Sequence, residues 1–171
     1  MQSNKTEEGK TVADSAAEMV QIVLPNDTNM LGNLLGGTLM HWIDLVGAIV
    51  ANRHCRKPIV TASMEGLDFH APIRLGYIVI LQGRMHYAGK SSMEVGVEVY
   101  SENGLTGERF HTSSAILTYV AVDTTGKPVG VPTLILTTDE EKQHYQEALA
   151  RKKQRLERLG KNPAPDRPKA P

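Results

Sequence analysis

The clearest pattern along the chain is a strict alternation of polar and apolar residues between positions 92 and 99. One face would carry Met93, Val95, Val97 and Val99, and the other Ser92, Glu94, Gly96 and Glu98. A period of two is typical of a β-strand with one buried face. Similar β-prone runs, bounded by Gly, Pro or Asn-Gly turns, occupy residues 19–24, 59–69, 77–87, 91–100 and 109–122. The pattern therefore predicts five strands.

Between the first and second strands the pattern changes to that of a helix. Residues 38–55 contain no proline and are apolar on nearly every face, which predicts a long helix that is buried all round. Pro58 follows the end of this segment, and Gly36-Gly37 precedes its start. A second helix is predicted to begin at the capping box 138–141, with few apolar positions, so that it lies outside or against a partner. The fold class is α+β.

The chain divides into one folded unit with polar flanks. Residues 1–17 are polar and are expected to form a flexible arm, and residues 18–136 form the main domain. The second helix is placed at 137–160. Residues 161–171 contain four prolines and are expected to be a disordered tail.

Composition excludes several classes of function. The 171 residues carry 19 basic and 19 acidic side chains, so there is no basic excess of the kind that binds nucleic acid or anionic lipid. The longest uncharged stretch, 28–43, is too short and too polar to span a bilayer, and the polar residues at the start of the sequence lead us to expect no secretory signal. One cysteine, Cys55, excludes a disulfide framework and a cysteine-rich zinc site. We expect a cytoplasmic protein without a metal site.

Asp44 is the strongest candidate for chemistry. It lies in the middle of the helix predicted to be buried, between two apolar runs. A buried carboxylate is costly unless it is hydrogen-bonded or paired, so this position favours a catalytic acid or base. The structural alternative is a carboxylate that faces a solvated notch or binds neighbouring backbone.

The start of the same helix is a candidate oxyanion site. Gly36 and Gly37 leave backbone N–H groups uncovered at the positive end of the helix dipole, and Asn33 lies just upstream. Gly37 and Asp44 share a helix face but lie about 10 Å apart along its axis. One carbonyl needs both partners within about 3 Å. A shared reaction centre therefore predicts that two subunits supply these groups.

The sequence evidence for a phosphate contact is weaker. Residues 83–91 resemble a P-loop but have the wrong spacing and join two strands, so we reject nucleotide hydrolysis. Lys90, Ser91 and Ser92 remain candidates for a phosphate contact from a hairpin turn.

These features together resemble the hotdog-fold acyl-CoA thioesterases, in the branch of short bacterial enzymes and a tandem-domain brain-type enzyme. The resemblance covers residues 18–155, and its matching segments include 25–29, 32–37, 59–63, 89–95, 105–108 and 118–122. It implies a five-stranded antiparallel sheet wrapped around one long central helix, plus the C-terminal helix. It also implies hydrolysis of acyl-CoA to free CoA and a carboxylic acid, without a metal or organic cofactor.

The resemblance also implies roles for individual residues. Asp44 would act as general base or as nucleophile, and Asn33 would come from the opposite subunit. Backbone at Gly36 and Gly37 would polarise the thioester carbonyl. CoA would be bound by residues Lys90, Ser91, Ser92, Arg74 and Arg56. The expected assembly is a homodimer as the minimal active unit, within a hexamer built as a trimer of dimers, with a possible regulatory nucleotide.

Two other classes of function stay open from the sequence. An enoyl-thioester hydratase of the same fold would pair a histidine with the acid, and His41 is the candidate. A non-enzymatic sensor would bind acyl-CoA or a nucleotide without turnover. Neither the acyl-chain length nor the function of the C-terminal helix can be read from the sequence.

Overall fold

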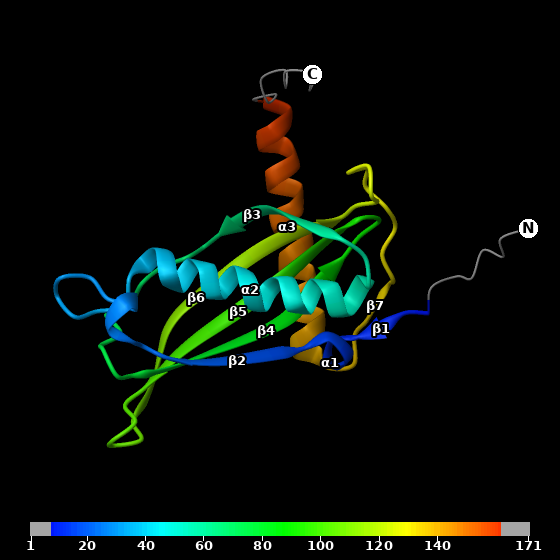
Figure 1. Cartoon of the computed structure of the whole chain (residues 1–171). Coiled ribbons are helices and arrows are strands. Elements are labelled where there is room, and N and C mark those ends of the chain that lie inside the picture. Colours follow the sequence, from blue (N-terminus) through cyan, green and yellow to red (C-terminus); the bar gives the residue numbers. More distant parts are fainter. Residues whose placement is uncertain (1–7, 162–171) are drawn as a thin grey trace, which may run out of the picture.

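The computed structural model describes residues 8–161, and its centre is a five-stranded antiparallel sheet that curves around one long helix (Figure 1). The strands lie in the order β2-β4-β5-β6-β3, with α2 on one face and α3 on the other. These elements are β2 (Ala17–Ile22), β3 (Ile59–Glu65), β4 (Ile78–Ala88), β5 (Ser92–Glu102), β6 (Arg109–Ala121), α2 (Gly36–Cys55) and α3 (Asp139–Lys161). The predicted α+β class, its five strands and its two helices are confirmed.

The alternation in β5 decides which side chains meet each helix. Val95, Val97 and Val99 are fully buried in the core beneath α2. On the opposite face Glu94 binds Arg151 of α3. β3 ends at Glu65, earlier than the expected residue 69, because Gly66 takes a positive φ of 66° and turns the chain.

Helix α2 is buried on one side only, which corrects the expectation of a helix buried all round. Its core side includes Ile43, Val46 and Val50, each with no exposed surface. The opposite side leaves Met40, Leu45 and Ile49 41–43% exposed. The apolar pattern predicts the long helix correctly, but no residue between 8 and 161 covers its second apolar side.

The N-terminal segment is folded from residue 9 onward, so the expected flexible arm is wrong for residues 9–17. β1 (Lys10–Thr11) pairs in parallel with β7 (Leu134–Ile135), and α1 (Val12–Ser15) follows directly. Val12 is 3% exposed, and the Arg53 guanidinium donates a hydrogen bond to the Ala16 carbonyl at 2.6 Å. The partners of this segment come from distant parts of the chain, which is why its local composition suggested a loose arm. Residues 1–7 lie outside the described part.

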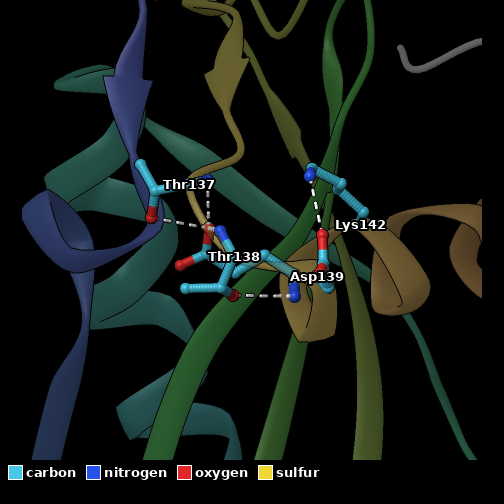
Figure 2. Close-up of polar contacts among 5 residues, drawn as sticks. Thr137, Thr138, Asp139 and Lys142 are labelled. Atoms are coloured by element: carbon cyan, nitrogen blue, oxygen red, sulfur yellow. Dashed lines mark hydrogen bonds and ion pairs between the residues drawn. The ribbon is translucent and has the colours of Figure 1, made fainter.

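Helix α3 begins at the predicted capping box (Figure 2). The Thr138 hydroxyl accepts a hydrogen bond from the Glu141 N–H at 3.1 Å, and the Glu141 carboxylate accepts one from the Thr138 N–H at 3.1 Å. Lys142 and Asp139 form an ion pair at 2.7 Å on the first turn of the helix. The helix then packs on the outer face of the sheet, where Ala148 is fully buried. The predicted tail, apart from Lys161, lies outside the described residues.

Neither long helix in the described part of the chain is sufficiently apolar over its length to cross a membrane.

Candidate active site

Asp44 lies in the middle of α2, where its carboxylate meets the edge of the sheet. One carboxylate oxygen, Oδ1, accepts a hydrogen bond from the Thr61 hydroxyl at 2.9 Å and another from the Tyr119 hydroxyl at 3.1 Å. The Tyr119 hydroxyl also lies 3.0 Å from the Asp44 carbonyl oxygen. Thr61 and Tyr119 are directly paired across β3 and β6, which explains why both reach one oxygen. The half-buried carboxylate is thus held by two donors.

Tyr119 is fully buried and keeps its proton. Burial, followed by the negative charge of Asp44, raises the pKa of its phenol far above the usual range. The hydroxyl therefore remains a hydrogen-bond donor. Its approach to α2 depends on Gly47, since a Cβ at that position would lie 2.4 Å from the phenol oxygen. Gly47 follows Asp44 by three residues and so lies on the same side of the helix.

A cavity of about 400 Å³ opens at the start of α2. Leu35 precedes the helix without a side-chain cap, so the first N–H groups, including those of Gly36 and Gly37, have no partner within the helix. Gly36 and Asn33 line this cavity together, and its floor includes the buried side chains of Leu34, Leu39 and Ile73. The geometry suits a carbonyl oxygen or an anion bound by backbone donors.

Asn33 is placed by a loop that a second asparagine organises. The Asn29 side-chain oxygen accepts hydrogen bonds from the N–H groups of Leu31 at 2.9 Å and Asn33 at 3.2 Å. The Asn29 N–H in turn donates to the Asn33 carbonyl at 2.8 Å. Within residues 8–161 the Asn33 side chain makes no hydrogen bond, so its amide can bind a ligand in the cavity.

One chain does not bring the carboxylate to this cavity. Asn33 and Gly36 line it, whereas Asp44 does not. Gly37 is exposed beside it, and Asp44 lies about 10 Å further along the helix axis. Within one chain, the candidate carboxylate and the candidate carbonyl-binding groups are therefore separate.

The five residues predicted to bind CoA form two groups. Lys90 and Ser91 form the turn between β4 and β5. The Ser91 carbonyl accepts a hydrogen bond from the N–H of Ala121, and Ala121 pairs with Ile59, three residues after Arg56. The turn therefore lies near Arg56 and the end of α2. Ser92 begins β5 at the same end. Arg74 instead pairs with Asn33 near the start of α2. The two helix ends are separated by about 28 Å, so within one chain the groups are far apart.

The other histidine and cysteine side chains of α2 do not join Asp44 in a site. His54 is fully buried and bonded to the Pro132 carbonyl at 2.9 Å, and burial raises the pKa of the Cys55 thiol. His41 is exposed and shares no hydrogen bond with Asp44 within residues 8–161. That part of the chain also holds no group of three His, Cys, Asp or Glu side chains arranged to bind a metal ion.

A carboxylate on a long helix, with an antiparallel sheet wrapped around that helix, defines a hotdog-fold protein with a candidate hydrolytic site. The sequence profile of the thioesterase superfamily matches residues 31–108. A Bacillus subtilis protein named as an uncharacterized acyl-CoA thioester hydrolase is 41% identical over 154 residues, covering 90% of each chain. The chain belongs to the thioesterase superfamily, in the branch of acyl-CoA thioester hydrolases that its motifs resemble.

Solved structures agree with this assignment. A hexameric acyl-CoA thioesterase in its apo form is 41% identical with a TM-score of 0.85, and the match covers 89% of this chain and 97% of that one. The acyl-CoA hydrolase of Staphylococcus aureus, solved with butyryl-CoA and CoA, is 36% identical with a TM-score of 0.82, covering 89% and 93%. Variants of that enzyme with an aspartate, an asparagine or a threonine replaced by alanine have also been solved.

The human cytosolic acyl coenzyme A thioester hydrolase is 36% identical over 146 residues. The match covers 84% of this chain but only 38% of that protein. The resemblance of this single unit is therefore to part of a longer chain.

Sequence reasoning did not identify Thr61, Tyr119 or Gly47 as site residues. In the sequence, Thr61 and Tyr119 belong to β-prone segments and to the family-matching segments 59–63 and 118–122, but neither residue receives a role there. The usable signal was the alternation in 109–122, which places Tyr119 on the same face as the buried Leu117 and Ala121. Their contact with Asp44 depends on the pairing of β3 with β6, two strands far apart in the sequence.

Proposed function

We propose that this protein hydrolyses acyl-CoA to free CoA and a carboxylic acid, with Asp44 as the general base. The observation that carries the proposal is the anchored Asp44 carboxylate. Two donors hold Oδ1, while Oδ2 receives no hydrogen bond within residues 8–161 and is left to accept a proton. The relatives named above, whose names specify acyl-CoA hydrolysis, supply the class of substrate.

In the proposed reaction a water oxygen attacks the thioester carbonyl carbon while Oδ2 takes a proton from that water. The negative charge on the carbonyl oxygen is stabilised by the N–H groups at Gly36 and Gly37 and by the Asn33 amide. The C–S bond then breaks, and the CoA thiolate takes the proton from Asp44. The products are the carboxylic acid and the CoA thiol, and the proposed reaction uses no metal or organic cofactor.

A complete site in this proposal contains two subunits. The distance of about 10 Å between Asp44 and the helix start supports this, because both groups must reach one thioester. Two exposed features suit a subunit interface: the apolar side of α2 and the free edge of β3, where Val60 is 49% exposed. We propose a homodimer as the active unit within a hexamer, the assembly of two similar thioesterases of known structure.

Lys90, Ser91, Ser92, Arg56 and Arg74 stay proposed contacts for CoA. Their division between two ends of α2 means that they contact different parts of a bound CoA or CoA in different subunits. A cytoplasmic location and a regulatory nucleotide stay predictions from the sequence.

The experiment that tests this function measures free thiol released from acyl-CoAs, from acetyl to palmitoyl, by the wild type, Asp44→Ala and Asp44→Asn. We expect turnover by the wild type and its loss in both variants without a change of oligomeric state. Thiol release that persists in Asp44→Ala would exclude Asp44 as the base. Binding of CoA without any thiol release would instead favour a sensor, and hydration of enoyl-CoA would favour the hydratase.

Nucleophilic attack by Asp44 itself is distinguished by isotope labelling. With a general base, a single turnover in ¹⁸O-labelled water places the label in the released acid. With a nucleophile, a mixed anhydride forms at Asp44, and water that opens it at the Asp44 carbonyl leaves the label in the protein and an unlabelled carboxylate oxygen in the acid. Label on Asp44 after the first turnover therefore identifies a nucleophile.

A further inference from the structure

The contacts of Tyr119 with Asp44 are unusual in reaching both its backbone and its side chain. The phenol oxygen lies 3.0 Å from the Asp44 carbonyl oxygen and 3.1 Å from Oδ1. The Thr61 hydroxyl donates to the same Oδ1 at 2.9 Å. Both strand residues therefore bind one carboxylate oxygen, and the other oxygen stays without a donor in the described part of the chain.

The surroundings of the phenol fix this geometry. Tyr119 is fully buried in the core, so its ring cannot leave the position between β6 and α2. The pairing of β3 with β6 shifts between Thr61 and Ser63, directly beyond the Thr61 pair with Tyr119. On the helix, the absent side chain of Gly47 leaves the space that the phenol oxygen occupies. The strand pairing, the helix and Gly47 thus together fix the position of the Tyr119 hydroxyl.

We propose that Tyr119 is a positioning residue for catalysis: with Thr61 it holds Asp44 Oδ1, so that Oδ2 is the oxygen that takes the proton from water. This inference rests on the proposed role of Asp44 as base. Tyr119 itself does not contact the substrate. Its link to the Asp44 carbonyl ties the carboxylate to the helix backbone, which limits rotation of the side chain.

The chemistry of the phenol fits a permanent donor. Its raised pKa keeps the proton on the oxygen across the working pH range, so Tyr119 does not compete with Asp44 as a base. A hydrogen bond to a charged carboxylate is also stronger than one between neutral groups. Removing it is expected to change the reactivity of Asp44 more than the stability of the fold.

The test compares Tyr119→Phe with Tyr87→Phe, a matched control in the same sheet. Tyr87 is 9% exposed, and its hydroxyl is bonded to Lys152 on the opposite face, away from Asp44. We expect Tyr119→Phe to lower kcat by roughly 10- to 100-fold, the size of a hydrogen bond to a charged group, with KM nearly unchanged. Tyr87→Phe is expected to keep the wild-type kcat.

The pH profile gives a readout that a purely structural role would not move. Loss of a donor disfavours the charged carboxylate, so the acidic limb of kcat/KM is expected to move to higher pH in Tyr119→Phe. His41 lies one helical turn before Asp44 and is the neighbouring titratable group on α2. A His41→Asn variant is expected to leave the limb in place, which excludes His41 as its source.

The outcomes separate this inference from the proposed function. If Asp44→Ala abolishes turnover but Tyr119→Phe keeps the wild-type kcat and pH profile, the positioning role is wrong and the function stands. If Asp44→Ala stays active, the proposed mechanism fails first. If Tyr119→Phe does not fold, Gly47→Ala provides the test, since its methyl displaces the phenol oxygen and is expected to reproduce the loss of kcat. A folded Gly47→Ala with wild-type kcat would overturn the inference.

Discussion

Arg151 of α3 lies against Glu94 in the centre of the outer face of the sheet, with 2.7 Å between Nη2 and Oε1. Glu94 is 2% exposed, and both of its hydrogen bonds in the described chain come from this guanidinium. Its second oxygen, Oε2, is buried without a partner there. Arg151 of α3 is therefore the residue that compensates the buried charge of Glu94.

We expect Arg151→Met to destabilise the fold by about 3 kcal/mol, because it leaves a buried carboxylate unpaired. Urea denaturation measures the change. Arg158→Met is the matched control, since Arg158 is 70% exposed and its contact with Glu65 is long at 3.5 Å. Its expected cost is below about 1 kcal/mol. Equal losses in both variants would show that Glu94 does not need Arg151.

His86 predicts a loss of stability at mildly acidic pH. Burial, with the positive charges of His144 and Arg151, lowers the pKa of His86 to about 4. The unfolded chain binds this proton near pH 6.5, so the folded state loses stability as the pH falls from about 6.5 to about 4. The expected loss from His86 is about 3 kcal/mol.

The measurement is urea denaturation of the wild type and His86→Phe between pH 7 and pH 4. The aromatic replacement keeps a ring against His144, whose centroid lies 4.4 Å away. We expect a shallower pH dependence in the variant. Some dependence persists because burial also lowers the pKa of His54. His70→Asn, at an exposed position, is expected to keep the wild-type slope, and an unchanged slope in His86→Phe would contradict the prediction.

Gly47→Ala is expected to destabilise the protein by about 1–3 kcal/mol through overpacking. The new methyl would lie 2.4 Å from the Tyr119 phenol oxygen and 3.2 Å from the ring. In a Tyr119→Phe background the shorter contact is gone, so the same substitution is expected to cost less. Thermal unfolding of the four proteins in this double-mutant cycle measures the difference. Gly104→Ala, with its nearest neighbour at 3.6 Å, is the control, and a purely additive cycle would refute a clash at the phenol.

Local patterns predicted the elements because their causes are local. The alternation around Val95, the two glycines that begin α2 and the capping box at Thr138 each depend on residues a few positions apart. Asp44 was also identifiable, since a charge within an apolar helix stands out without knowledge of its neighbours.

The features that the sequence does not reveal depend on contacts between distant parts of the chain. Thr61 and Tyr119 meet Asp44 only through strand pairing and a register shift, and Gly47 has meaning only once the phenol is in place. The order of residues 9–17 likewise comes from pairing with β7 and from Arg53. The apolar pattern of α2 predicts full burial, because a sequence does not show whether each apolar side of a helix is covered by the same chain or by another one.

The proposed division of the site between subunits predicts that two inactive variants restore each other. Asp44→Ala lacks the proposed base, and Asn33→Ala lacks the amide proposed to bind the carbonyl oxygen. In a mixed dimer, the intact Asp44 of one subunit meets the intact Asn33 of the other, so one of its two sites is complete. Random mixing is expected to recover about a quarter of wild-type activity, since half of the dimers are mixed and each has one working site.

The measurement mixes the two variants under conditions that exchange subunits, or co-expresses them with different tags and isolates the mixed species. Each variant alone, and Asp44→Ala mixed with the double variant Asp44→Ala/Asn33→Ala, are controls expected to stay inactive. Recovery in the first mixture alone places the carboxylate and the amide of one site on different subunits. If the mixture stays inactive although mixed dimers form, Asp44 and Asn33 act within one chain, and α2 must then bend or the loop of Asn33 must move to close the distance of about 10 Å.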